Sequence, residues 1–229
     1  MNTFKLQEKR IPTLAWTVTG LFSAASLTFF LPFEIAHKVT FPVAILALAS
    51  LWLCPWQIPL ALLSSAVGDY FGSCGTFIAQ MGSFALAHAM YIVYFIDRYF
   101  TKVERDRKLT PKMKGYLAMV TFCSLALMAA VFVRIVPCAD KGILRTGISI
   151  YACLICAMMV LALLQRSSLF ALGAVLFVFS DFILAWNNFL EPVPYRQYLV
   201  LVTYFLAQWL LFIRTTPYRV APEMRIMRF

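Results

Sequence analysis

The sequence predicts an all-α membrane protein, a polytopic bundle of about eight transmembrane helices in a single domain that covers residues 1–229. Two observations lead to this prediction. Hydrophobic residues make up 62% of the chain and charged residues only 13%, whereas a soluble domain has about 25% charged residues. Apolar runs of about 20 residues, the length that crosses a bilayer, also recur along the chain. A soluble fold of this length could not bury so much apolar surface.

Eight apolar segments predict the eight helices. They cover approximately residues 13–31, 38–54, 57–73, 76–97, 114–135, 142–164, 167–189 and 195–213. The joins between segments contain prolines, which end helices, at Pro32, Pro55, Pro137, Pro192 and Pro194. The basic segment 98–113 is the one sizeable loop, and its mixed charges are typical of a connector near anionic headgroups.

The basic residues predict the orientation. With eight spans, both termini lie on one side of the membrane, and that side receives 15 of the 20 basic residues. The other side receives Lys38, Arg134, Lys141, Arg145 and Arg196. The positive-inside rule then predicts a multi-pass protein of the cell (inner) membrane with cytoplasmic N- and C-termini. A seven-helix count would divide the basic residues between the two sides and remove this asymmetry.

The net charge of +10 favours contact with anionic membrane lipids over nucleic acid. The basic residues flank apolar runs and lack the interleaved aromatic residues of a nucleic-acid platform. We therefore expect lipids as partners and no nucleic acid, and the oligomeric state is left open.

Two acidic residues stand inside apolar runs. Asp69 lies in Gly68-Asp69-Tyr70, and Asp181 lies in Ser180-Asp181-Phe182. A carboxylate at membrane depth is costly, so it is a functional-site hypothesis by default. At about 1.5 Å per residue, both lie roughly 18–21 Å from the cytoplasmic side. Two carboxyl groups that share one proton provide one acid and one base.

A tyrosine follows each of the two acids at a similar spacing. Tyr91 follows Asp69 by 22 residues, and Tyr204 follows Asp181 by 23. This spacing is compatible with two four-helix pseudo-repeats in the same orientation.

Other polar side chains fall near the same depth or at helix ends. Candidates for binding substrate or supporting the acids are His88, Tyr91, Ser180, Asn187, Tyr204 and Gln208, with Lys38 at a helix boundary. Ser180 could donate to a carboxylate. Each could instead be a helix-to-helix hydrogen bond, because lipid offers no polar partners.

No metal site or cofactor is predicted. The six cysteines lack the spacing of a structural zinc site, and two histidines do not make a three-histidine catalytic zinc centre. Cys74 and Cys138 fall on the same predicted side, so a disulfide between them is left open.

The chain resembles the YhhN family of membrane proteins over about residues 35–215. The matching segments are Gly68-Asp69, Phe84 to Tyr91 with His88 between them, Gly173 to Phe177 with Ser180-Asp181, and Tyr204 to Gln208. Tyr151 and Met158 fit the family's sixth helix. The family's early lysine-proline motif is altered, since Val39 follows Lys38.

The resemblance implies a lysoplasmalogenase, a hydrolase that cleaves the vinyl ether of a lysophospholipid to a fatty aldehyde and a glycerophospho-alcohol. It implies Asp69 and Asp181 as the catalytic residues. The chemistry suits them independently of the family, because one carboxylic acid can protonate the alkene while the other carboxylate stabilises the cation and activates water. We expect both carboxyl groups to line one cavity, without a metal.

Two other classes of membrane protein are alternatives to a hydrolase. Intramembrane aspartyl proteases carry a Gly-x-Gly-Asp segment, whereas this chain has Ala66-Val67-Gly68-Asp69 and lacks their partner motifs. A proton-coupled transporter or a lipid-binding membrane protein could use the same two acids. A transporter would need a polar path through both leaflets.

Overall fold

The computed structural model describes residues 13–32, 35–100 and 111–216, and these residues form α-helices and no strand. The α-helices are α1 Thr13–Phe30, α2 Thr40–Leu53, α3 Gln57–Ser73, α4 Phe77–Phe100, α5 Pro111–Ala130, α6 Ile143–Leu164, α7 Ser168–Phe189 and α8 Arg196–Thr215. A π-helix, Val131–Ile135, and a 3-10 turn, Val136–Cys138, follow α5. The all-α class predicted from the sequence is confirmed.

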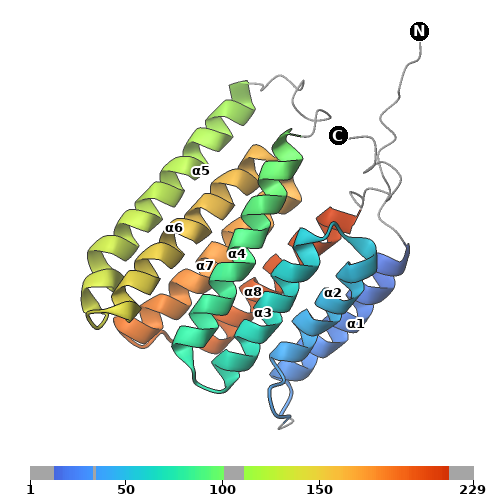
Figure 1. Ribbon diagram of the computed structural model, residues 1–229, viewed down its shortest axis with the longest axis horizontal. Helices are drawn as coiled ribbons and strands as arrows, with labels where there is room; N and C mark the ends of the chain where they lie inside the picture. The colour runs from blue at the N-terminus through green and yellow to red at the C-terminus, as the bar shows by residue number, and fades with distance from the viewer. Residues whose placement is uncertain (1–12, 33–34, 101–110, 217–229) are drawn as a thin grey trace.

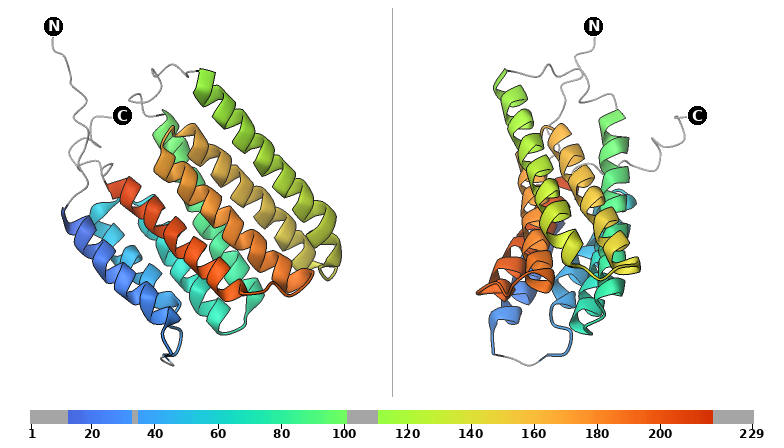
Figure 2. Two further views of the ribbon diagram at one scale, coloured as in Figure 1. Left: turned by 180° about the vertical axis from the view of Figure 1, so that it is seen from behind. Right: turned by 90° about the vertical axis from the view of Figure 1, so that its left-hand side faces the viewer.

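The helices run alongside one another in two layers. Helices α2, α3 and α4 face the viewer in Figure 1, and α1, α8 and α7 face the viewer from behind in Figure 2. Packing contacts connect α1, α2, α3, α4, α6, α7 and α8 in that order, and α8 also contacts α1. These helices therefore form a closed ring within the part of the chain that is described. Helix α5 lies outside the ring at one edge, beside α6 (Figure 1).

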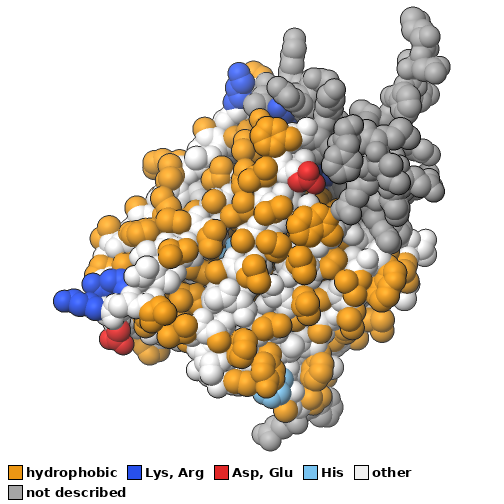
Figure 3. Space-filling view, in the orientation of Figure 1, with side chains coloured by type: hydrophobic (Ala, Val, Ile, Leu, Met, Phe, Trp, Pro, Cys, Tyr) orange, Lys and Arg blue, Asp and Glu red, His pale blue; other side chains and the backbone are white. Residues whose placement is uncertain are grey.

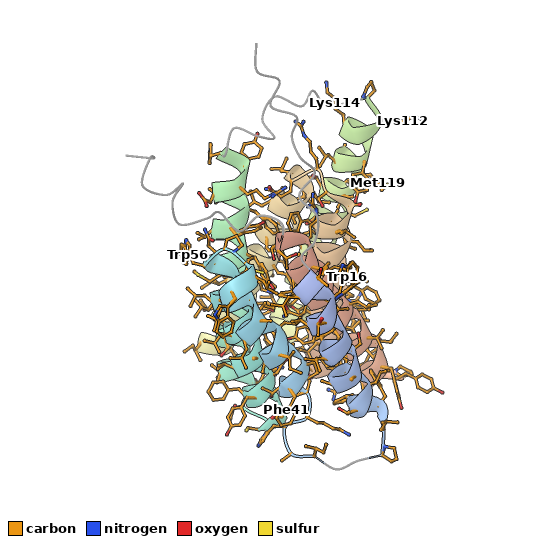
Figure 4. The ribbon with its side chains drawn as sticks, turned by 90° about the vertical axis from the view of Figure 1, so that its right-hand side faces the viewer. Trp16, Phe41, Trp56, Lys112, Lys114 and Met119 are labelled. Atoms are coloured by element: carbon orange, nitrogen blue, oxygen red, sulfur yellow. The ribbon has the colours of Figure 1, made fainter. Side chains whose placement is uncertain are left out.

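Consecutive helices run in opposite directions, so α1 begins and α8 ends at the same end of the bundle (Figure 1). We call this the basic end, because Lys112 and Lys114 project from it (Figure 4). Trp16 and Trp56 lie below these lysines and are about half exposed. Tryptophan is favoured where a bilayer meets water. The opposite end, where Phe41 lies (Figure 4), is called the far end.

Lipid is the natural solvent of this surface. Hydrophobic side chains cover most of the face in Figure 3, and large apolar residues such as Leu48, Phe122 and Val133 are more than half exposed. Six helices, all except α2 and α3, are long and apolar enough to cross a membrane. The chain is thus a multi-pass membrane protein. Because α2 has only 14 residues, or about 21 Å of helix, the count of eight spans and the cytoplasmic termini stay predictions.

Two glycines allow neighbouring helices to approach closely, one between α3 and α4 and one between α7 and α8. A Cβ atom on Gly68 of α3 would lie 3.0 Å from the Phe84 ring of α4. A Cβ atom on Gly173 of α7 would lie 3.2 Å from Leu211 of α8. In a membrane, where packing rather than water drives association, such positions let helices approach closely. The glycine before Asp69 therefore has the packing role that its place in the sequence suggests.

Two predictions fall partly or wholly outside this description. Most of the basic loop 98–113 lies outside the described residues, as do both termini. The proposed pair of four-helix repeats stays a prediction, although α3 packs along α4 as α7 packs along α8. Cys74 and Cys138 are both free thiols at the far end, so the disulfide left open by the sequence is not formed here.

The orientation can be tested with a membrane-impermeant thiol reagent on intact cells. We expect single-cysteine variants that keep exposed Cys74 or Cys138 to be labelled without permeabilisation, because the far end faces outwards under the positive-inside rule. The variant Lys112→Cys, whose thiol lies at the basic end, should be labelled only after permeabilisation. Labelling of Lys112→Cys in intact cells would reverse the predicted topology.

Candidate active site

Asp181 of α7 is held by two side chains from neighbouring helices. The Tyr151 hydroxyl of α6 donates to Asp181 Oδ2 at 2.5 Å. His88 Nε2 of α4 lies 3.4 Å from the same oxygen and 3.0 Å from the Tyr151 hydroxyl. His88 is fully buried, whereas the Asp181 side chain is 12% exposed. Three helices thus converge on one carboxyl group near the middle of the bundle.

The hydrogen-bond pattern favours one tautomer of His88. Tyr151 has a single hydroxyl proton and donates it to Asp181. The short contacts of His88 Nε2 are therefore satisfied when this nitrogen carries the imidazole proton. The other ring nitrogen, Nδ1, is buried and has no hydrogen-bond partner among the described residues. In this arrangement His88 and Tyr151 both direct protons towards Asp181.

Asp69 of α3 occupies a separate and drier environment. Its side chain is buried, and Asp69 Oδ2 accepts a hydrogen bond of 2.9 Å from the Tyr204 hydroxyl of α8. One turn further along α8, Gln208 accepts a hydrogen bond of 3.0 Å from the Tyr91 hydroxyl of α4. Tyr91 and His88 both lie on α4, yet the Tyr91 hydroxyl bonds to α8, whereas the His88 ring contacts side chains of α6 and α7. The sequence had placed them on nearly the same face.

Aromatic rings separate the two acids. Phe84 of α4 and Phe177 of α7 make edge contacts with each other and with the Tyr204 ring, at centroid distances of 5.5–6.4 Å. Phe177 also lies 4.7 Å from the His88 ring. The two carboxyl groups are still close enough to interact electrostatically. They are therefore neighbours across a layer of rings rather than a directly hydrogen-bonded pair.

An apolar cavity of about 720 Å³, including its open part, borders Asp181. Side chains of α4, α5, α6 and α7 line it, and the polar ones are Gln80, Tyr151 and Asp181. Apolar walls that carry a few polar groups are typical of small-molecule sites. The sequence led us to expect both acids on one cavity wall. Only Asp181 meets this expectation. Asp69 does not line the cavity, although the Phe84 ring that lines it packs against Gly68, next to Asp69.

The remaining candidate site residues make other contacts. Ser180 donates to the Val200 carbonyl of α8 at 3.0 Å, so the expected donation to a carboxylate is not observed. Asn187 accepts from the Val193 backbone in the α7–α8 connection at 3.1 Å. Lys38 lies at the far end, 3.4 Å from the Leu31 carbonyl and above the Phe29 ring. These contacts place Ser180 and Asn187 against α8 and the α7–α8 connection and Lys38 at the far end, and the supporting roles of these residues stay predictions.

Sequence reasoning missed the residues that α5 supplies to the cavity, namely Leu127, Met128 and Val131. The sequence does contain a signal for these residues. Together with buried Val120 and Ser124, these residues recur at spacings of three and four, which place them on one face of a helix. In a uniformly apolar helix, such a stripe does not stand out. No group of three or more metal-binding side chains occurs in the described segments, and metal independence stays a prediction.

Comparisons with known proteins identify relatives of this chain. A sequence profile described as the YhhN family matches residues 33–215. The chain is 33% identical to lysoplasmalogenase TMEM86B of Sus scrofa over 66% of its length, and 29% identical to that of Homo sapiens over the same share. The rat protein of that name is 30% identical over 68% of the chain.

The matched region spans 59% of the pig and human proteins and 60% of the rat protein. No solved structure shows significant similarity to the chain.

The Tyr204–Asp69 hydrogen bond should contribute to stability. We expect Tyr204→Phe to lower the thermal unfolding temperature of the detergent-solubilised protein, since a buried carboxyl group loses its donor at a cost of about 1 kcal/mol. Tyr198→Phe is the matched control, because Tyr198 lies on the same helix and is 54% exposed. Equal unfolding temperatures for the two variants would contradict a stabilising role for this bond.

Proposed function

The chain belongs to the YhhN family, and we propose that it is a membrane hydrolase of the lysoplasmalogenase type. Its substrate would be an alkenyl lysophospholipid, with ethanolamine or choline as the headgroup alcohol. The products are a fatty aldehyde and the corresponding glycerophospho-alcohol. One observation carries the proposal: a carboxyl group, Asp181, stands with Tyr151 on the wall of an otherwise apolar cavity.

Vinyl ethers are hydrolysed through protonation of carbon. A proton adds to the alkene carbon that is remote from the ether oxygen, and the double-bond electrons form an oxocarbenium ion. Water then adds to the carbon that bears the oxygen and loses a proton, which gives a hemiacetal. The hemiacetal hydroxyl then loses its proton and forms the aldehyde carbonyl as the bond to the glycerol oxygen breaks, and that oxygen takes up a proton. Carboxyl groups serve similar transition states in glycoside hydrolysis.

We assign the proton transfer to Asp181, because it is the acid that borders the cavity. Tyr151 and His88 hold its carboxyl group in place from two other helices. A proton donor fixed in this way is already oriented towards a bound alkene, which lowers the entropic part of the barrier. The apolar wall keeps water scarce, so the charge developing on the substrate is stabilised mainly by fixed protein groups.

Asp69 would act from behind the aromatic layer. The two carboxyl groups are close enough to interact electrostatically across this layer. In this scheme the negative charge of Asp69 stabilises the oxocarbenium ion electrostatically. Asp69 does not line the cavity, so Asp181 rather than Asp69 would contact the substrate. The reaction needs no metal in this scheme.

The central test is aldehyde release by purified protein. Wild type should release aldehyde from alkenyl but not from acyl lysophospholipid, and Asp181→Asn should lower the rate by at least about 100-fold, as loss of a general acid does. Asp69→Asn should also lower it. Asp97→Asn is the control, because Asp97 contacts Gln57 at the basic end. Absence of aldehyde with wild type would exclude the hydrolase, as expected for a transporter, whereas fully active Asn variants would exclude only the assigned residues.

The position of proton transfer can be checked by mass spectrometry. When the reaction runs in D₂O and the aldehyde is reduced at once, we expect one deuterium on the carbon next to the former carbonyl carbon. This label follows from protonation of the alkene in the first step. Product without deuterium at that carbon would contradict acid-catalysed hydrolysis and point to another way of breaking the ether.

A further inference from the structure

The cavity beside Asp181 has one wall that is built differently from the others. Helices α4, α6 and α7 belong to the closed ring. Leu127 and Met128 come from α5, which lies outside the ring, and Val131 comes from the π-helix that continues α5. We call these three residues the inner stripe of α5. No charged or hydrogen-bonding side chain belongs to this stripe. Whatever it contacts inside the cavity must therefore be hydrocarbon.

Helix α5 is the least embedded of the long helices. In its most apolar window, 11% of the residues are buried, compared with 44% for both α6 and α7. A second groove lies where the π-helix that continues α5 meets α6. It is lined by Phe132 and by residues of α6 such as Ser149 and Cys153. Side-chain packing therefore fixes α5 less tightly than it fixes the helices of the ring.

The far end of α5 departs from regular helix. The π-helix Val131–Ile135 begins where the inner stripe ends, and Pro137 follows it. Short π-helices are rare and often mark functional sites. Beyond them, Arg145 of α6 donates to the carbonyls of Pro137 and Ala139 at 2.9 and 2.8 Å. The connection is thus anchored at its end, while the turn beside the cavity is a π-helix.

The shape of the cavity limits what can occupy it. On α7 the lining extends from Val178 to Phe189, so about 12 Å of helix lies on the far-end side of Asp181 and less than one turn on the other side. A long hydrocarbon chain that reacts at Asp181 cannot end within that short part. It must continue along the cavity wall, and α5 is the wall that borders the bilayer.

We propose that the inner stripe of α5 binds the hydrocarbon chain of a single-chain membrane amphiphile and determines which chain lengths the site accepts. This inference rests on the proposed function, since it places the reacting bond at Asp181. The chain reaches the stripe from the bilayer beside α5. Leu127 and Met128 are then specificity-determining residues, although neither takes part in proton transfer.

Binding of a substrate analogue tests this inference without catalysis. The probes are lysophosphoethanolamines with saturated octyl or hexadecyl ether chains, which have no alkene to protonate, and their affinities are measured for protein in lipid nanodiscs. Leu127→Trp and Met128→Trp fill part of the cavity. We expect each to lower the hexadecyl-to-octyl affinity ratio about tenfold, the discrimination that a lost hydrocarbon contact provides.

Matched controls come from the opposite face of α5. Phe122 and Leu125 are 72% and 54% exposed, so Phe122→Trp and Leu125→Trp should leave the affinity ratio unchanged. Met128→Ala, which enlarges the cavity, should raise the ratio, and this result would not follow from a general loss of folding. Equal weakening of both probes by the Trp variants, or an equal effect of the controls, would overturn the inference.

The outcome is separable from that of the proposed reaction. If the chain-length ratio shifts as expected but alkenyl substrate yields no aldehyde, the hydrolase proposal fails and the chain site stands. If aldehyde is released and the Trp variants leave the chain-length ratio unchanged, the chain site fails alone. Absence of binding of both probes to the wild type would also overturn the chain site.

Discussion

The cost of a carboxyl group at membrane depth is the constraint on which the rest of this structure depends. Lipid supplies no hydrogen bonds, so each acid must find its partners within the protein. Asp69 and Asp181 both meet this requirement with a tyrosine from another helix, Tyr204 and Tyr151 respectively. The ring of helices therefore cannot close in another register without leaving a buried carboxyl group unpaired.

The two acids satisfy this constraint in different surroundings, and this difference separates their proposed roles. Asp181 gains His88 as a second neighbour and keeps one side open to the cavity. Asp69 is enclosed by α8 and by the Phe84 ring, which approaches closely because residue 68 is glycine. A pair that looks symmetric in the sequence is thus asymmetric in space, with Asp181 on the cavity wall and Asp69 buried beside α8.

The cavity itself depends on α5, the helix that takes no part in closing the ring. A membrane enzyme for single-chain lipids needs a route from the bilayer to a polar group that must stay out of contact with lipid. A loosely packed outer helix with an irregular end provides such a route, while the ring preserves the geometry of Asp181, Tyr151 and His88. The packing that stabilises the site and the surface that we propose to bind a hydrocarbon chain therefore belong to different helices.

The sequence alone determined the all-α class, the approximate helices and the two intramembrane acids, because apolar run length and rare charges are local properties. It also supplied the tyrosines and His88 as candidates. Only the tertiary structure decided that Tyr204 pairs with Asp69, that Tyr151 pairs with Asp181, and that Ser180 bonds to the α8 backbone. Helix rotation and neighbour choice decide these pairings, and a uniformly apolar lipid-facing surface leaves almost no trace of either in the sequence.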